Sequence, residues 1–158
     1  MKEDQQPKLY MLIGPPCSGK STWVENNLPT TPILSTDRYI EQFANLSGKT
    51  YSEVFQEIIK QATSKMYSDL EIYVNNDMDI IWDQTNLAPK ARQSKLSKVP
   101  DHYKKIAICF NITEEEFLKR NQVRAKQGKS ISLSVFQNMM STYVPPSKSE
   151  GFDKIINV

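Results

Sequence analysis

Short apolar runs alternate along the chain with longer segments in which apolar residues recur every three or four positions. The longest periodic segment runs from Tyr51 to about Val74, and its spacing is that of an amphipathic helix. Short continuous apolar runs are typical of strands that are buried on both faces of a sheet. We therefore expect strands at residues 9–13, 32–35, 79–82, 105–110 and 154–158.

Helical segments lie between these expected strands. Thr113 and Glu116 form a capping-box pattern at the start of a helix that runs to about Lys126. Pro145 and Pro146 prevent a later helix from continuing. The other helices are expected at residues 20–27, 89–99 and 133–143. Strands that alternate with helices predict a three-layer α/β fold, in which a five-stranded parallel sheet carries helices on both faces.

The length and composition fit one domain. With 158 residues, of which 39% are hydrophobic, the chain is long enough for one core and too short for two, so we expect residues 1–158 to form a single domain. The polar residues 1–7 are expected to be a flexible N-terminal segment. No run approaches the roughly 20 apolar residues that span a bilayer. We expect no membrane contact and a cytoplasmic location, in the host cytoplasm if the protein is viral, with the nucleus also open. Cys17 and Cys109 provide no disulfide framework and no zinc site.

The net charge of +2 hides an uneven distribution. Residues 90–129 contain eleven basic and four acidic residues, whereas residues 1–89 contain seven basic and twelve acidic ones. A local excess of positive charge favours a polyanionic partner such as a nucleic acid. Ordinary solvated helix faces would give the same count, so both interpretations stay open.

Residues 14–21, Gly-Pro-Pro-Cys-Ser-Gly-Lys-Ser, match the phosphate-binding pattern G-x-x-x-x-G-K-[ST] in full. They lie between an expected strand and an expected helix, which argues against a chance glycine turn. In such a P-loop the backbone N–H groups face the phosphates, and the glycines leave room for that approach. Lys20 is expected at the β- and γ-phosphates and the Ser21 hydroxyl at the metal ion, so ATP and Mg²⁺ are the expected cofactors. The expected nucleotide-binding residues are Gly14, Pro15, Pro16, Cys17, Ser18, Gly19, Lys20, Ser21 and Thr22.

Two aspartates follow expected strands, Asp37 after the second and Asp83 after the third. Ligands of parallel sheets bind at the carboxyl ends of the strands, so these two carboxylates are candidates for catalysis. Asp37 is a candidate general base for an attacking hydroxyl, and Asp83 is a candidate to orient metal-bound water or to fix the phosphate loop. The alternatives are structural: Asp37 as the N-cap of a helix, and Asp83 as the anchor of the turn at residues 84–86.

Arg120 and Arg124 lie four residues apart on one face of a predicted helix, just before a loop that contains Gly128. Guanidinium groups suit the negative charge that spreads over the phosphoryl oxygens during transfer, so the pair is a candidate catalytic lid over ATP. The alternative is a pair of ordinary surface arginines.

Four segments together resemble the successive motifs of the phage polynucleotide 5′-hydroxyl kinase domain. They occur in the same order and at similar spacing over most of the chain. The segments are residues 14–23 (GPPCSGKSTW), 35–39 (STDRY), 82–87 (WDQTNL) and 119–124 (KRNQVR). That family transfers the γ-phosphate of ATP to the 5′-hydroxyl end of DNA or RNA, in a tunnel-like site with an arginine-bearing lid. The resemblance therefore implies a polynucleotide 5′-kinase whose substrate is a nucleic acid 5′-OH end.

The resemblance also implies roles for the matching residues. Asp37 corresponds to the general base and Asp83 to a second essential acid. The lysine and serine of the P-loop correspond to the contacts with the phosphates and the metal ion. Arg124, with Arg120 nearby, corresponds to the lid arginine that stabilises the γ-phosphate.

One position departs from this pattern. The phage enzymes carry an arginine three residues beyond the general base, where it grips the acceptor's 3′-side phosphate, and this chain has Ile40 there. Arg38, beside Asp37, is one candidate for that contact, and a different mode of holding the acceptor is the other.

Two alternative functions therefore stay open. The first is a P-loop kinase of a small metabolite, which the departure at Ile40 favours. The second is a nucleotide-binding, RNA-binding module without transfer activity. Residues 83–86 (DQTN) support it, because they resemble the kinase-like domain of heterogeneous nuclear ribonucleoprotein U, a relative associated with RNA binding.

Overall fold

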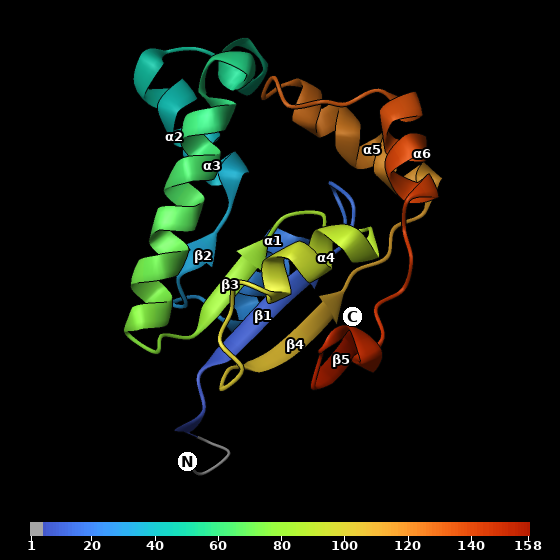
Figure 1. The fold of residues 1–158 in the computed structure, drawn as a ribbon. Helices are drawn as coiled ribbons and strands as arrows, with labels where there is room; N and C mark the ends of the chain where they lie inside the picture. The colour runs from blue at the N-terminus through green and yellow to red at the C-terminus, as the bar shows by residue number, and fades with distance from the viewer. Residues whose placement is uncertain (1–4) are drawn as a thin grey trace.

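Five parallel strands form the central sheet of the computed structural model, which describes residues 5–158 (Figure 1). Their order across the sheet is β2-β3-β1-β4-β5. The strands are β1 Lys8–Ile13, β2 Ile33–Leu34, β3 Ile80–Asp83, β4 Lys104–Cys109 and β5 Lys154–Asn157. β1 lies in the middle, and Leu9, Met11 and Leu12 are fully buried there, as a strand covered on both faces requires. The expected five-stranded parallel sheet is confirmed.

Helices cover both faces of the sheet, as the alternation of strands and helices predicts. They are α1 Lys20–Asn27, α2 Thr36–Ser47, α3 Tyr51–Asn75, α4 Pro89–Leu96, α5 Glu114–Ala125, α6 Leu133–Ser141 and a 3₁₀ helix, η2, Lys148–Glu150. Val24 of α1 packs on one face with Ile81 and Ile108. Met66 of α3 and Leu96 of α4 pack on the opposite face. The fold is therefore the three-layer α/β arrangement.

α2 and α3 form a helical pair, here called the arm, that extends beyond the carboxyl ends of the strands (Figure 1). The arm has its own core, in which Ile40 and Ala44 of α2 pack against Val54 and Ile58 of α3. All four side chains are at most 2% exposed. Because this core fixes α2 against α3, it also fixes the first turn of α2 above the carboxyl ends of the strands.

The loop at residues 126–132, here called the α5–α6 loop, reaches the arm from the opposite side of the molecule, above the carboxyl ends of the strands (Figure 1). The Asn121 side chain holds this loop through two hydrogen bonds to Ile131. It accepts from the Ile131 N–H at 3.1 Å and donates to the Ile131 carbonyl at 2.7 Å. The Ser52 hydroxyl of the arm donates to the Gly128 carbonyl at 2.7 Å. The arm and the α5–α6 loop therefore meet above the carboxyl ends of the strands.

The N-terminal segment that we expected to be flexible falls partly outside the described residues, which begin at Gln5. Pro7 is buried, and its carbonyl accepts a hydrogen bond from the Lys104 N–H at 2.8 Å. Within residues 5–158, none of the helices has the length and apolar character needed to cross a membrane.

Candidate functional site

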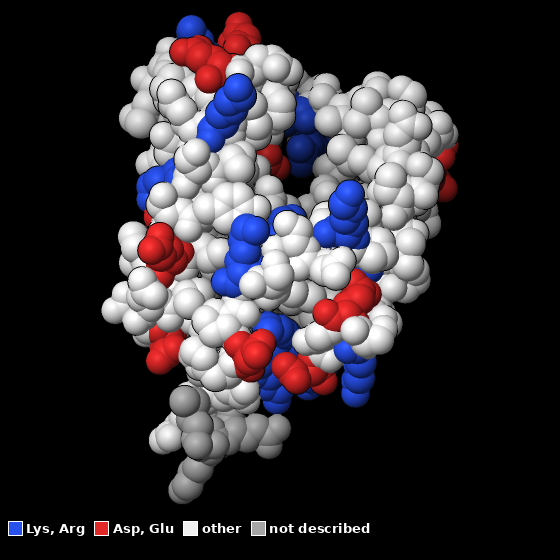
Figure 2. Space-filling model, viewed as in Figure 1, with Lys and Arg blue, Asp and Glu red and all other residues white. Residues whose placement is uncertain are grey.

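A cavity of about 910 Å³ lies at the carboxyl ends of the strands, between the arm and α5. In Figure 2 the molecule is hollowed at this place, with basic side chains visible inside the opening. The cavity is lined by all the residues predicted to be catalytic: Lys20, Asp37, Asp83, Arg120 and Arg124. Of the predicted nucleotide-binding residues, 16–22 line it, whereas Gly14 and Pro15 are buried.

The two glycines of the P-loop meet different requirements, close packing at Gly14 and a left-handed backbone at Gly19. A methyl group at Gly14 would lie 2.8 Å from the Ser18 hydroxyl oxygen and 2.9 Å from Cβ of Phe110, which is closer than real contacts allow. Cys17 and Gly19 have left-handed backbone conformations, with φ of 68° and 95°. Gly19 is the N-cap of α1 and has no side chain to cap the first N–H groups of the helix. These groups are therefore available to an anion, so the loop fits the phosphates of a nucleotide.

Lys20 folds back over the P-loop and joins it to the turn after β3. Its ammonium donates to the Gly14 carbonyl at 2.9 Å and lies 3.5 Å from the Gln84 carbonyl. The Gly14 N–H in turn donates to the Thr85 carbonyl at 2.9 Å. Burial lowers the pKa of Lys20, and the charges of Asp83 and Asp37 oppose that shift. The lysine is therefore a half-buried cation of the cavity wall, and it lies within the electrostatic reach of both carboxylates.

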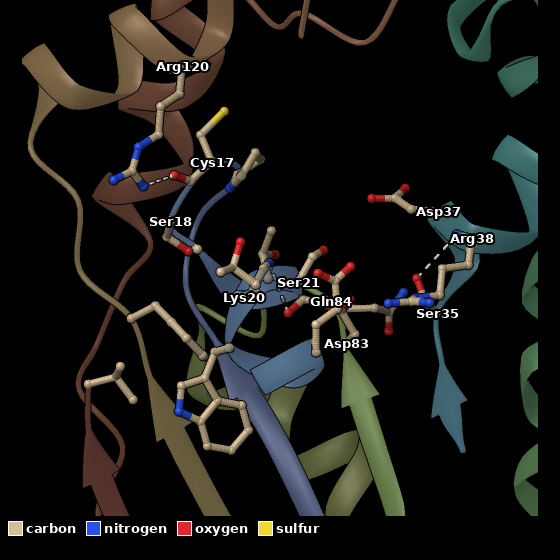
Figure 3. A pocket seen from close by; sticks show the side chains of 18 of the residues that line it. Cys17, Ser18, Lys20, Ser21, Ser35, Asp37, Arg38, Asp83, Gln84 and Arg120 are labelled. Carbon is tan, nitrogen blue, oxygen red and sulfur yellow. Dashed lines mark hydrogen bonds between the residues drawn. The ribbon is translucent and has the colours of Figure 1, made fainter. Parts of the chain in front are cut away.

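Asp37 lies in the first turn of α2 and points into the cavity, on the side opposite the P-loop (Figure 3). The interpretation of Asp37 as an N-cap is wrong. Ser35 is the N-cap, and its hydroxyl accepts from the Arg38 N–H at 3.3 Å. The Asp37 side chain is exposed and accepts a hydrogen bond from the Tyr51 hydroxyl at 2.5 Å.

Asp83 ends β3 between Asp37 and the P-loop (Figure 3). Burial raises the pKa of Asp83, and the charges of Lys20 and Arg38 counteract part of that rise. The turn that follows is held by Asn86, whose side-chain amide donates to the Leu12 carbonyl at 2.8 Å. Asn86, rather than Asp83, therefore joins this turn to β1.

Both predicted lid arginines face the cavity from α5. Arg120 donates to the Cys17 carbonyl at 2.6 Å, which attaches α5 to the P-loop (Figure 3). Arg124 donates to the Lys129 carbonyl at 3.4 Å, and its positive charge acts on the Cys17 thiol. Burial raises the pKa of that thiol, against the opposing charges of the two arginines. The pair therefore lies beside the loop that would hold the phosphates.

Sequence reasoning missed several residues that line the cavity or support it. The sequence predicts Tyr51 only as the start of an amphipathic helix, yet its hydroxyl donates a hydrogen bond to Asp37. Lys129 lines the cavity and pairs with Glu41 of α2. Lys95 donates to the Asn86 side chain, and burial together with the charge of Lys20 lowers the pKa of Lys95 to about 8. Of these three residues, only Lys129 has a signal in the sequence, because it is a basic residue in a glycine-containing loop.

The basic block at residues 90–129 does not form one surface. Arg92 is fully buried and pairs with Glu150 at 2.8 Å. Lys105 lies near the start of β4, away from the carboxyl ends of the strands. In Figure 2 the basic side chains on the viewed face are interspersed with acidic ones. The part of the block that faces the cavity is Arg120, Arg124 and Lys129.

One family model and several solved structures are similar to this chain over most of its length. A family model described as an AAA domain matches residues 9–146. A candidate kinase from Chloroflexus aurantiacus J-10-fl is 20% identical with a TM-score of 0.68, over 98% of this chain and 85% of that one. A chain of the Pnkp1/Rnl/Hen1 RNA repair complex is 23% identical with a TM-score of 0.66, over 86% of this chain and only 43% of that one. A gluconokinase from Sinorhizobium meliloti 1021 is 14% identical with a TM-score of 0.55, over 97% and 82% of the two chains.

At these identities the solved structures bear on the fold alone, and they agree on an α/β P-loop kinase fold. The family model, in contrast, spans most of the chain, from β1 to beyond α6. Its first residues lead directly into the phosphate cradle. The chain therefore belongs to the AAA domain family and has the fold of a P-loop kinase.

Proposed function

We propose that this protein transfers the γ-phosphate of ATP to the 5′-hydroxyl end of DNA or RNA. The observation that carries the proposal is the pairing of two sites across one cavity: a P-loop on one wall and the exposed carboxylate of Asp37 on the opposite wall. A phosphate held by the loop and a hydroxyl bound beside Asp37 would approach each other inside this cavity.

On the donor side, the P-loop amides and Lys20 would bind the β- and γ-phosphates of ATP. Ser21, at the start of α1, would hold Mg²⁺ together with the phosphates, and the ion would neutralise part of their charge. Arg120 and Arg124 would stabilise the charge that develops on the transferred group, because planar guanidinium donors match phosphoryl oxygens. Asp83 would keep Lys20 oriented through their electrostatic attraction.

On the acceptor side, Asp37 would accept the proton of the attacking hydroxyl. The acceptor oxygen then forms a bond to the γ-phosphorus, the bond from that phosphorus to the β-phosphate oxygen breaks, and ADP leaves. Arg38 lines the same cavity and is our candidate to hold an acceptor phosphate. Ile40 cannot do so, because it is 0% exposed in the arm core.

The choice of a nucleic acid as acceptor rests on three supports. The segments around Asp37, Asp83 and Arg124 resemble those of polynucleotide 5′-kinases. The chain is similar in fold to a chain of an RNA repair complex. Three basic residues of α5 and the following loop face the cavity, which suits a polyanion.

A kinase of a small metabolite is the second candidate. Burial of Ile40 favours it, because the position at which the phage kinases carry an arginine for the acceptor's phosphate belongs here to the arm core. A gluconokinase shares the fold, which shows that the scaffold accommodates such acceptors.

The test is incubation of 5′-OH DNA and RNA oligonucleotides with γ-labelled ATP and Mg²⁺, beside a panel of sugars and small alcohols. We expect label at the 5′ end of the oligonucleotide and none with the Lys20→Met variant. Label transferred to a small alcohol alone would replace the proposal with the metabolite kinase. RNA binding without labelling would replace it with the RNA-binding module.

A further inference from the structure

Tyr51, the first residue of α3, donates its hydroxyl hydrogen to Oδ1 of Asp37 at 2.5 Å. The ring is partly buried and packs beside Phe55, with ring centroids 5.8 Å apart. The backbone is fixed by the capping box that Thr50 and Glu53 form at the helix start. Burial and the hydrogen bond to Asp37 raise the pKa of the Tyr51 hydroxyl, so it remains protonated at neutral pH. Tyr51 is therefore a fixed donor toward the carboxylate.

The α5–α6 loop holds Tyr51 from another side. The Lys129 ammonium lies 5.8 Å from the centroid of the Tyr51 ring and forms an ion pair with Glu41 of α2. The neighbouring Gly128 lies so close to α3 that a Cβ atom on it would be 2.6 Å from Cβ of Thr50. Residues of α2, α3 and the α5–α6 loop therefore meet around one phenol ring.

We propose that Tyr51 is a positioning residue for the acceptor reaction: its hydroxyl holds the Asp37 carboxylate in the cavity, and Lys129 holds Tyr51 in place. The inference rests on the proposed function, in which Asp37 is the general base. An exposed aspartate in the first turn of a helix has several rotamers, and a hydrogen bond from a fixed phenol selects one of them. Oδ1 accepts from Tyr51, so Oδ2 is the oxygen that takes the proton of the acceptor.

The test compares Tyr51→Phe with wild type and with Tyr67→Phe. The first variant keeps the ring and removes only the hydroxyl. The control removes a hydroxyl from the same helix, where the ring packs on Trp82 in the core and no hydrogen bond to Asp37 is lost. We expect Tyr51→Phe to lower kcat about tenfold to hundredfold, the loss expected for one hydrogen bond to a charged group. KM for ATP and the thermal unfolding midpoint should stay unchanged, and the control should match wild type.

Lys129→Met tests the second half of the inference. It should lower kcat in the wild-type background and have little further effect in Tyr51→Phe, because its contribution passes through the phenol. Equal effects in both backgrounds would show that Lys129 acts independently. An unchanged kcat in Tyr51→Phe would overturn the positioning role. A higher kcat would also overturn it and would indicate that the phenol competes with the acceptor for Asp37.

Failure of the inference is distinguishable from failure of the proposed function. A wild-type protein that labels oligonucleotides and a Tyr51→Phe variant that labels them equally well would reject only the inference. If the wild type labels no acceptor, a crystal structure of Tyr51→Phe decides. An Asp37 carboxylate turned away from its wild-type orientation would support the positioning role, and an unmoved carboxylate would reject it.

Discussion

Replacing Arg92 with methionine is expected to destabilise the protein by about 3–5 kcal/mol, the usual cost of removing one partner of a buried ion pair. The guanidinium is 0% exposed and donates to both carboxylate oxygens of Glu150, at 2.8 and 3.2 Å. It also donates to the carbonyls of Asn86, Leu87 and Val144, at 3.0, 2.8 and 2.9 Å. Methionine would fill a similar apolar volume but donate to none of these groups.

The assay is thermal unfolding at pH 7. For a domain of this length each kcal/mol shifts the midpoint by about 2–4 °C, so Arg92→Met should lower it by about 6–20 °C. Lys90→Met, an exposed change on the same helix, is the matched control and should shift it by less than about 2 °C. An Arg92→Met midpoint as close to wild type as that of the control would refute the reasoning.

Glu150 gives the same network a pH dependence. Burial raises the pKa of Glu150, but hydrogen bonds from Arg92 and from the Ser147 N–H outweigh it, so the pKa lies below its ordinary value. A carboxyl with a lowered pKa adds stability above its unfolded pKa of about 4.3 and loses it as the pH falls through the folded pKa. The difference in stability between wild type and Glu150→Gln should therefore be full at pH 7 and shrink below about pH 4.

Four further changes test the site. Asp37→Ala should abolish transfer and leave ATP affinity nearly intact by calorimetry; weaker ATP binding with unchanged transfer would contradict its role as the base. Gly14→Ala should cost about 1–3 kcal/mol in chemical denaturation and weaken nucleotide binding, because the added methyl would lie 2.8 Å from the Ser18 hydroxyl; unchanged values would contradict the close packing. Ile40→Arg should destabilise the protein by about 3–5 kcal/mol instead of tightening acceptor binding, because it buries a charge in the arm; a stable variant with a lower acceptor KM would contradict this. Because the pKa of Lys95 is lowered to about 8, wild type should gain stability relative to Lys95→Met between about pH 8 and pH 10.4, and a flat difference would contradict the shift.

The sheet and the phosphate cradle were predictable because their signals are local. Residues 9–13 form an uninterrupted apolar run, and the structure places β1 there, in the middle of the sheet. The glycines at 14 and 19 occur where side chains would collide or where φ is positive. The helix expected over residues 89–99 ends earlier, at Leu96. The exact end of a helix depends on a few backbone hydrogen bonds that the spacing of apolar residues does not specify.

The acceptor side was less predictable because its contacts join distant parts of the chain. Tyr51 has the spacing of a core residue in an amphipathic helix, and nothing in its neighbours shows that its hydroxyl reaches Asp37. Lys129 meets Glu41 only because two separate helical units converge over the sheet. Arg92 counts as one more positive charge in the sequence, although it is buried beside Glu150. Charge counting therefore overstates the surface that a polyanion would meet.

Arg92 also connects stability to the phosphate site. It binds the carbonyls of Asn86 and Leu87, and these residues belong to the turn after β3. The carbonyls just before them, of Gln84 and Thr85, hold the Lys20 ammonium and the Gly14 N–H. A buried cation that is absent from the cavity wall thus sets the position of the loop that would grip the triphosphate. The same turn also ends the strand that delivers Asp83, so loosening it would disturb both carboxylate and lysine at once.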